Sequence, residues 1–407
     1  MLSEDAIEKL VQPIVDRQEA INLYVIQLIA NRIKEIGELK PSDIYKLQRL
    51  MAMGADVRKI NKELARLTSL QVSDIKKLIK DVAEDGYAMA KPMYDYRHLA
   101  FIPFAQNTNL QNIMKAVQQQ TVDSYINLSR SSAYMIRDLS NPKVLVPTSV
   151  SKTYQTAVDE AIQAVQSGVT DYGSAMRRTL KQLNDSGLRY VNYRPESGGI
   201  YTQRLDTALR RNILDGVRAV NQGVQDEVGK QFGADGKELS VHAMSAPDHE
   251  PIQGHQFTNE EYSKLQSSVP FEDATGQKFG AIERHIGQYN CHHFAWSIIL
   301  GVNKPNYTKK QLSEIIKRNN AGYTLPNGKH LTLYECSQKM REMETSIRRA
   351  KEGQMMAQEA GDNPLAKAYQ AKASELSKKY KVFAKDCGLT PDMGRCSVPG
   401  YRRISTK

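Results

Sequence analysis

Apolar residues recur every three or four positions along the start of the chain, from Ile7 to Ile36. This spacing lines one face of a helix, because 3.6 residues complete a turn. Pro13 interrupts the pattern only near its beginning, and Gly37 supplies a stop signal at its end. The sequence therefore predicts a long amphipathic helix, whose apolar face has to be buried against other elements.

The same periodicity continues along much of the chain, interrupted by an aromatic segment. Tyr94, Tyr96, Phe101 and Phe104 lie among prolines, and we expect this loop to pack across the helices or to contact a partner. Further helices are predicted over 44–53, 57–67, 72–89, 109–138, 150–183 and 200–232, with a final pair over 331–352 and 364–386.

The stretch 187–199 combines glycine, proline and serine between two helical patterns, which is typical of a boundary. With 407 residues the chain exceeds the usual size of a single core. We predict a mainly α protein, with a helical docking region over 1–190, a smaller α+β domain with a His/Cys loop cluster over 200–300, and a basic helical segment over 301–407. Residues 239–242 are predicted as a short strand of the second unit.

Neither a membrane span nor a secretory signal is expected. No stretch reaches the ~18 consecutive apolar residues that a spanning helix requires, and the first five residues are acidic where a signal would be basic. The four cysteines form no CxxC pair, so reduced thiols are expected. We predict a soluble protein made in the cytoplasm and without a membrane partner.

The net charge of +11 is concentrated in the last quarter of the chain. Residues 301–407 contain 21 Lys+Arg and 10 Asp+Glu, which leaves 35 of each for residues 1–300. A basic segment of this kind suits nucleic acid or an acidic protein surface, although a solvated helical face is the alternative. No GxxxxGK[ST] loop and no GxGxxG fingerprint occurs, which disfavours a nucleotide-dependent enzyme.

Six of the eight histidines fall between His242 and His293, in a region whose composition predicts loops and short strands. His242, His249, Cys291 and His293 form a candidate zinc site, because nitrogen and sulfur ligands suit this ion. On an extended segment Cys291 and His293 face the same side. The spacing fits no established zinc template, so we expect no cofactor, with zinc as the alternative.

Two other interpretations of this cluster stay open. In the structural one, Cys291 is a small buried hydrophobe and four neighbours support the loops: Asp248 braces an imidazole, Gln253 and Gly254 form a tight turn, and Asn290 is hydrogen-bonded in a turn. In the catalytic one, Cys291 is a nucleophile with His249 or His293 as base. Alternatively, the histidines hold the metal of a nuclease, with Asp248 and Glu250 completing the site.

Two segments also carry sequence motifs that resemble those of a known family. Residues 240–254 read SVHAMSAPDHEPIQG, and residues 290–293 read NCHH. Together they resemble the C-terminal motif of the minor capsid proteins of tailed phages, in particular the phage minor capsid protein 2 family, a group similar to the MuF-like minor head proteins. The segment YECSQKMREME with IRRAK after it resembles the basic helix that follows this motif. The matching region spans about residues 200–403.

This basic helix carries cations around an apolar face formed by Met340, Met343 and Ile347. Arginine forks suit phosphates and carboxylates, so we expect contact with DNA or an acidic partner. The candidate contact residues are Lys339, Arg341, Arg348, Arg349 and Lys351.

The resemblance implies a structural protein of the procapsid and virion, made in the bacterial host cytoplasm. It implies a place near the portal vertex, where the protein would aid head assembly or the passage of DNA into and out of the head. The expected partners are the portal protein, the major capsid protein or both, with packaged double-stranded DNA as a non-specific partner. The alternatives are a metal-dependent nuclease or cysteine hydrolase carried in the head, and a non-specific DNA-binding module.

Overall fold

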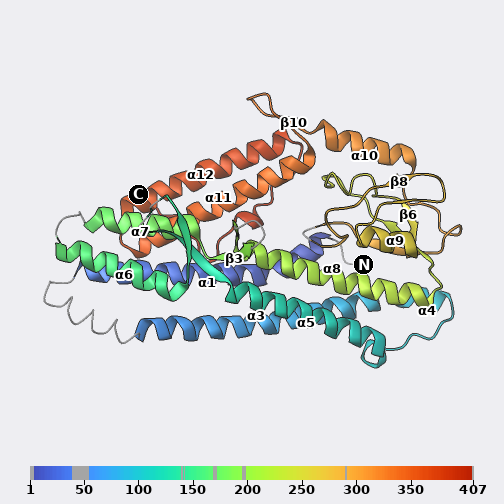
Figure 1. Cartoon of the computed structure of the whole chain (residues 1–407), viewed down its shortest axis with the longest axis horizontal. Helices are drawn as coiled ribbons and strands as arrows, with labels where there is room; N and C mark the ends of the chain where they lie inside the picture. Colours follow the sequence, from blue (N-terminus) through green and yellow to red (C-terminus); the bar gives the residue numbers. More distant parts are fainter. Residues whose placement is uncertain are drawn as a thin grey trace.

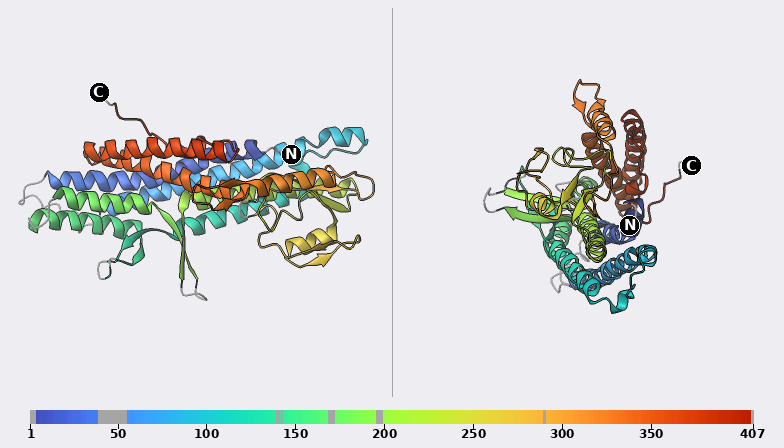
Figure 2. Two further views of the ribbon diagram at one scale, coloured as in Figure 1. Left: turned by 90° about the horizontal axis from the view of Figure 1, so that it is seen from above. Right: turned by 90° about the vertical axis from the view of Figure 1, so that its right-hand side faces the viewer.

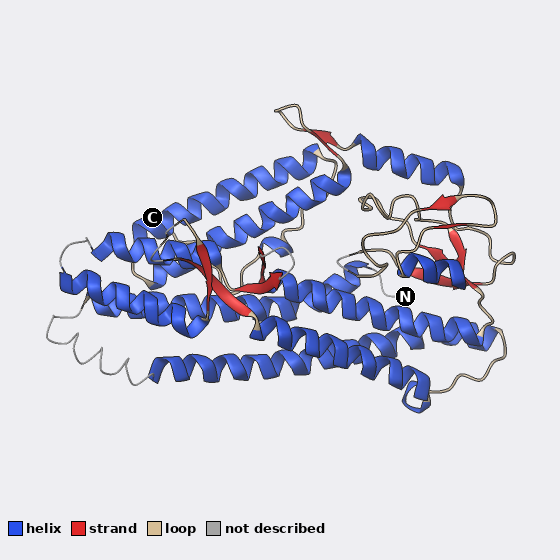
Figure 3. Cartoon of the chain, viewed as in Figure 1, coloured by secondary structure: helices blue, strands red, loops and turns tan. Residues whose placement is uncertain are grey.

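A computed structural model describes residues 4–38, 55–138, 141, 143–167, 172–194, 199–288 and 291–405. The helix predicted over 44–53 lies outside these residues, as does Asn290. An elongated bundle of helices forms the body of the molecule, with a smaller mixed part at one end and a helical pair along one side (Figure 1, Figure 3).

Long helices lie side by side in the body, and Figure 2 shows them both lengthwise and from the end. The two longest have 34 residues each, or about 51 Å at 1.5 Å per residue. The body consists of α1 (Glu4–Gly37), α3 (Ala55–Ala88), α5 (Thr108–Arg130), α6 (Val150–Ser167), α7 (Tyr172–Ser186) and α8 (Leu205–Gln231), with the short α4 (Lys91–Tyr96) and η1 (Phe104–Gln106) between α3 and α5.

The apolar stripe of α1 is buried along its length, which confirms the predicted amphipathic helix. Val11 near its start lies in a core shared with α3, α5 and α8. Ile29 and Ile33 lie in a second core shared with α6 and α7. Because α1 crosses both cores, it joins the two halves of the body.

The segments predicted as two helices, 57–67 and 72–89, form the single helix α3. Ser69, between the two predicted segments, is a potential helix cap. Its hydroxyl instead donates to the carbonyl of Ala65, and that of Thr68 donates to the carbonyl of Leu64. Serine and threonine can satisfy their hydroxyls within a helix in this way, so a potential cap does not end one.

An antiparallel sheet in the order β2-β1-β3-β4 lies partly where helices were predicted. The helix predicted over 109–138 ends at Arg130, and the one over 150–183 is divided between α6 and α7. Residues 187–199, predicted as a boundary, include all of β3, and the helix predicted from 200 begins at Leu205 after β4. The strands are β1 (Ser132–Arg137), β2 (Leu145–Thr148), β3 (Arg189–Arg194) and β4 (Gly199–Arg204).

The mixed part lies against the end of α8. Its three-stranded antiparallel sheet has the order β6-β5-β9, and the strand predicted at 239–242 is displaced to β5, which ends at Leu239. Leu239, Phe257 and Ala295 are among its buried core. The elements are β5 (Gly236–Leu239), β6 (Gln256–Thr258), α9 (Asn259–Gln266), β7 (Phe271–Glu272), β8 (Lys278–Phe279) and β9 (Ala295–Ile298).

The C-terminal helical pair follows the prediction closely, although the first helix continues past residue 352. Both helices contribute to the core around α1, through Met356 and Ala366. The segment consists of α10 (Lys309–Ala321), β10 (Tyr323–Thr324), β11 (His330–Leu331), α11 (Leu333–Glu359), α12 (Asn363–Asp386) and η2 (Gly394–Cys396).

The predicted fold class is confirmed: mainly α, with a helical N-terminal region and a smaller α+β part that carries the His/Cys cluster. The division at 190 and 300 stays a prediction. Helix α8 belongs by sequence to the middle unit, yet its core residues Leu209, Val217 and Val224 pack with the N-terminal helices. None of the described helices is long and apolar enough to cross a membrane.

Candidate functional site

His249, Cys291 and His293 come together on the loops next to the small sheet. One ligand atom from each lies within 4.8 Å of the other two, and all three side chains are buried. Cys291 Sγ lies 3.4 Å from His249 Nδ1 and 3.5 Å from His293 Nδ1. The turn around His249 and the segment leading into β9 supply the two halves of the cluster.

The hydrogen-bond partners of the two Nε2 atoms determine which nitrogen of each ring carries the proton. His249 Nε2 lies 2.7 Å from the carbonyl oxygen of Arg284, which can only accept, so Nε2 carries the proton. His293 Nε2 lies 3.4 Å from Gln253 Oε1, and that oxygen already accepts from the backbone N–H of His242. Both rings therefore direct an Nδ1 lone pair towards Cys291 Sγ.

Asp248 holds the loop that carries this carbonyl. Its carboxylate accepts from the Arg284 guanidinium and from the backbone N–H of Glu283. Burial opposes ionisation of Asp248, but the Arg284 hydrogen bond lowers its pKa below the ordinary value. The charged pair keeps the Arg284 carbonyl in position to accept from His249.

Gln253 and Gly254 close the turn that begins at His249. Gly254 has φ +72°, and a Cβ on it would lie 2.5 Å from Leu312 Cδ2, so the turn requires glycine both for conformation and for space. Together with Asp248, these residues support the imidazoles in the way the structural interpretation describes.

His242 lies beside the three-residue cluster and is not a member of it. Its ring is tilted against that of His293, with centroids 4.2 Å apart, and its Nδ1 lies 2.8 Å from the carbonyl oxygen of Ala243. The predicted four-residue ligand set is thus reduced to three residues whose ligand atoms converge.

The cluster lines a pocket of about 500 Å³ whose opposite wall is α11. Arg284 crosses this pocket, because its guanidinium donates to the Tyr334 hydroxyl at 3.1 Å. Arg341, from the basic helix, also lines it. Sequence reasoning missed the contact of Arg284 with Tyr334. Arg284 stands in no recognisable motif, and Tyr334 begins the YECSQKMREME segment but is brought to the histidines only by the fold.

The titration behaviour of the cluster opposes an activated thiolate. Burial raises the pKa of the Cys291 thiol, and burial lowers the pKa of both His249 and His293. Neutral imidazoles next to a protonated thiol form neither the imidazolium nor the thiolate that a cysteine nucleophile requires. Neutral imidazole is, however, the form that binds metal ions.

The basic residues of α11 are placed differently from the expectation. Arg348 lies in the interior, where it pairs with Glu19 of α1 at 2.6 Å and Asp206 of α8 at 2.8 Å. Lys351 donates to the carbonyl of Cys396, and Arg349 is half-buried. Contact of Arg348 with DNA would require its internal pairs to break. Lys339 is exposed, next to Glu342.

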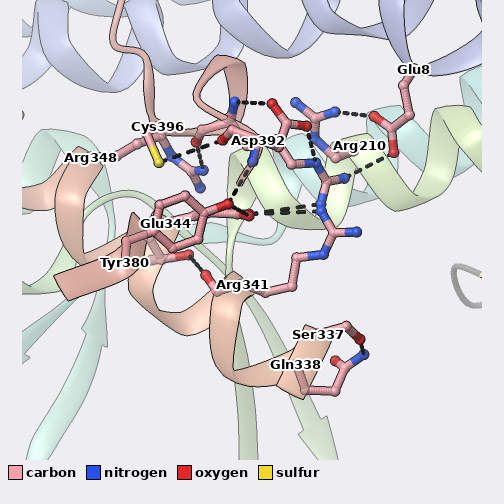
Figure 4. A network of polar contacts seen from close by, with 12 residues as sticks. Glu8, Arg210, Ser337, Gln338, Arg341, Glu344, Arg348, Tyr380, Asp392 and Cys396 are labelled. Atoms are coloured by element: carbon pink, nitrogen blue, oxygen red, sulfur yellow. Dashed lines mark hydrogen bonds and ion pairs between the residues drawn. The ribbon is translucent and has the colours of Figure 1, made fainter. Parts of the chain in front are cut away.

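These pairs belong to a wider network between α1, α8, α11 and the segment around η2 (Figure 4). Glu8 pairs with both Arg210 and Arg395, and Glu344 accepts from the Tyr380 hydroxyl at 2.8 Å. The apolar face of α11 behaves as predicted, with Met340 and Ile347 buried. The helix is therefore anchored by both apolar and ionic contacts.

Comparison with known proteins gives one family. The model for phage minor capsid protein 2 matches residues 2–385, nearly the whole chain. The chain therefore belongs to the phage minor capsid protein 2 family, as its motifs predicted, and the family implies a place in the phage virion. No curated protein and no solved structure gives a significant match.

Proposed function

We propose that the protein is a structural component of the phage head near the portal vertex, where it docks to the portal protein and aids head assembly or the passage of DNA. The family match over nearly the whole chain carries this proposal. The resemblance of the histidine motif to MuF-like minor head proteins supports the same place in the particle.

A patch of exposed apolar side chains offers the docking surface. We name it the tip patch, because α4 lies at one end of the helical body in Figures 1 and 2. Exposed apolar groups concentrated in one segment are typical of protein contact sites. The tip patch consists of Met89, Met93, Tyr96, Leu99 and Ile102, which are 42 to 83% exposed.

The aromatic segment that was predicted to pack across the helices or to contact a partner also forms the buried base of the tip patch. Tyr87 and Phe101 stack at 4.6 Å, and Tyr94 is buried against Phe232 of the α8 end. Tyr96, by contrast, is 83% exposed. The segment is thus rigidly held while its outer side chains stay accessible to a partner.

We infer that the protein is not an enzyme. The cysteine hydrolase alternative needs a reactive thiolate, whereas burial raises the pKa of Cys291. The nuclease alternative needs a metal-bound water next to a bound phosphodiester, and the acidic Asp248 is engaged with Arg284 instead of lining the cluster as a ligand.

Photocrosslinking in procapsids tests the docking. A benzophenone amino acid in place of Tyr96 should form a covalent adduct with the portal protein, because this position is accessible and surrounded by apolar groups. The same substitution at Val382, which is 59% exposed on α12, is the matched control and should give no portal adduct. Adducts are identified by mass spectrometry of particles from the phage that encodes the chain.

Capture of the major capsid protein alone from position 96 would contradict a place at the portal vertex. Equal capture of the portal protein from positions 96 and 382 would contradict the assignment to the tip patch.

A further inference from the structure

The three converging ligands have the chemistry of a late first-row metal site. Zinc takes thiolate sulfur at about 2.3 Å and imidazole nitrogen at about 2.0 to 2.1 Å. Around a tetrahedral ion these bond lengths put sulfur and nitrogen roughly 3.5 Å apart. Cys291 Sγ lies 3.4 and 3.5 Å from the two Nδ1 atoms, so both sulfur–nitrogen distances already match those around a tetrahedral ion.

We propose that His249, Cys291 and His293 bind one zinc ion through Nδ1, Sγ and Nδ1, and that this ion ties the turn at residues 246–254 to the segment that enters β9. This site is separate from the docking surface at the tip patch and from any role in DNA passage.

The surroundings of the rings match those of metal ligands. Metal-bound histidines ordinarily donate their second N–H to a carbonyl or carboxylate, which fixes the orientation of the ring. His249 donates to the Arg284 carbonyl and His293 to the Gln253 side chain, and Asp248 in turn holds Arg284. Both lone pairs are thereby aimed at one point beside Cys291 before any ion arrives.

Zinc binds imidazole in its neutral form and cysteine as the thiolate, so the Cys291 thiol has to lose its proton on binding. That proton leaves to solvent as the Sγ–Zn bond forms. All three ligands line the pocket, so water from it can reach a fourth coordination position.

The decisive measurement is the metal content of the full-length protein. After removal of metals with a chelator and dialysis against zinc alone, we expect about one zinc per chain by elemental analysis. Cobalt in place of zinc should give the visible absorption of a tetrahedral ion and a near-ultraviolet band from thiolate-to-cobalt charge transfer. The thermal unfolding midpoint should rise on zinc addition and return with chelator.

Matched cysteine variants locate the ion. Cys291→Ser should lose the charge-transfer band and bind zinc at least about tenfold more weakly, while circular dichroism reports whether it folds. Cys396→Ser, which changes another buried thiol away from the pocket, should keep both properties. His249→Asn provides a second variant if Cys291→Ser does not fold.

The proposal is overturned if the wild-type protein retains less than about a tenth of an equivalent of zinc, or if Cys396→Ser and not Cys291→Ser loses the charge-transfer band. Because metal content is measured on the isolated chain, failure here leaves the portal contact untouched, and failure of that contact leaves the metal site untouched.

Discussion

The buried ion network raises a question of charge balance at the level of single residues. Three carboxylates, Glu19, Asp206 and Glu352, pair directly with two guanidinium groups, those of Arg204 and Arg348. All five side chains are at most 11% exposed, so one uncompensated negative charge would be costly. A single proton removes this imbalance.

The proton belongs on Glu19. Burial, reinforced by the neighbouring Asp206 and Glu352, raises its pKa to about 8 despite Arg348. Burial also opposes ionisation of Asp206, but Arg204 and Arg348 lower its pKa. Glu19 is therefore the member of the network that stays protonated at neutral pH, and Asp206 the one that stays charged.

Glu19→Gln and Asp206→Asn should consequently differ in their effects. At pH 7 Glu19 is protonated in the folded state but ionised in the unfolded state. The first variant removes this ionisation, so it should be as stable as the wild type or more stable by up to about 3 kcal/mol. The second leaves the buried Arg348 without a charged partner, whereas Arg204 keeps Glu352, and it should destabilise the protein by roughly 3 to 5 kcal/mol. Urea denaturation of both variants at pH 7 measures the difference.

The pH dependence of the free energy of unfolding tests whether Glu19 carries the proton. A carboxyl whose pKa is raised on folding stabilises below its unfolded value, 4.5, and loses this contribution as the pH rises through about 8. Glu19→Gln should flatten the decline of stability over that range. Equal destabilisation by both variants, or an unchanged decline in Glu19→Gln, would contradict the assignment of the proton.

Part of the candidate site could be predicted from its residues alone. The density of histidines indicated a site that includes His249, Cys291 and His293, and Gly254 predicted a turn. The exclusion of His242 depends on its ring lying against His293, and the role of Arg284 depends on its backbone carbonyl, which no side-chain motif encodes.

At the level of elements, helix α8 lies very close to α5 because glycines stand at their contact. A Cβ on Gly216 would lie 2.3 Å from Thr121 Oγ1, and one on Gly223 would lie 2.6 Å from Ile113 Cγ2. Thr121 is β-branched and has few alternative rotamers within a helix, so it cannot readily make room. The two helices share the core around Val217 and Val122.

Gly216→Ala should therefore destabilise the protein by about 1 to 3 kcal/mol, the usual range for overpacking, although alanine is the better helix former. Gly86→Ala in α3 is the matched control, since its Cβ would meet Asn221 Oδ1 at an ordinary 3.4 Å. The control should be neutral or stabilising by up to about 1 kcal/mol. Thermal unfolding of the two variants distinguishes them, and a stabilised Gly216→Ala would disprove the tight contact.

Helices and strands were unequally predictable for a physical reason. The stripe of α1 and the pair α11 and α12 follow from local periodicity, which a helix needs over many turns. Strand β1 continues directly after α5 and is defined by its partners: Tyr134 pairs with Thr148 of β2, and Ser132 with Tyr190 of β3. Pairing with distant segments leaves little local signal, so this sheet was assigned to helix and loop.

At the scale of the whole molecule, the exposed basic residues of the C-terminal helical pair lie mainly on α12, whereas the sequence predicted a basic contact surface on α11. Helix α12 lies along one side of the body (Figure 1). Arg348 and Lys351 are engaged by contacts within the molecule, whereas the lysines of α12 are exposed. Two exposed acidic residues, Glu375 and Asp386, accompany them. The exposed lysines are Lys367, Lys372, Lys378, Lys379, Lys381 and Lys385.

If this face meets packaged DNA, binding should depend strongly on salt. Each phosphate contact contributes about −0.9 to the slope of log K against log salt on duplex DNA, because counterions are released. Replacing Lys367, Lys378, Lys381 and Lys385 by Gln should flatten the slope by up to about 3.6, without changing sequence preference. The fold should persist, since all four side chains are exposed.

A second variant with the same loss of charge distinguishes DNA binding by the α12 face from attraction of DNA by the net charge of the protein. Lys59, Lys62, Lys76 and Lys77 are exposed on α3, and their replacement by Gln should leave the slope nearly unchanged. Fluorescence anisotropy with a duplex of mixed sequence over a range of salt concentrations measures both variants. Equal flattening in the two would show that net charge alone attracts DNA, and undetectable binding at low salt would assign the α12 face to an acidic protein of the head.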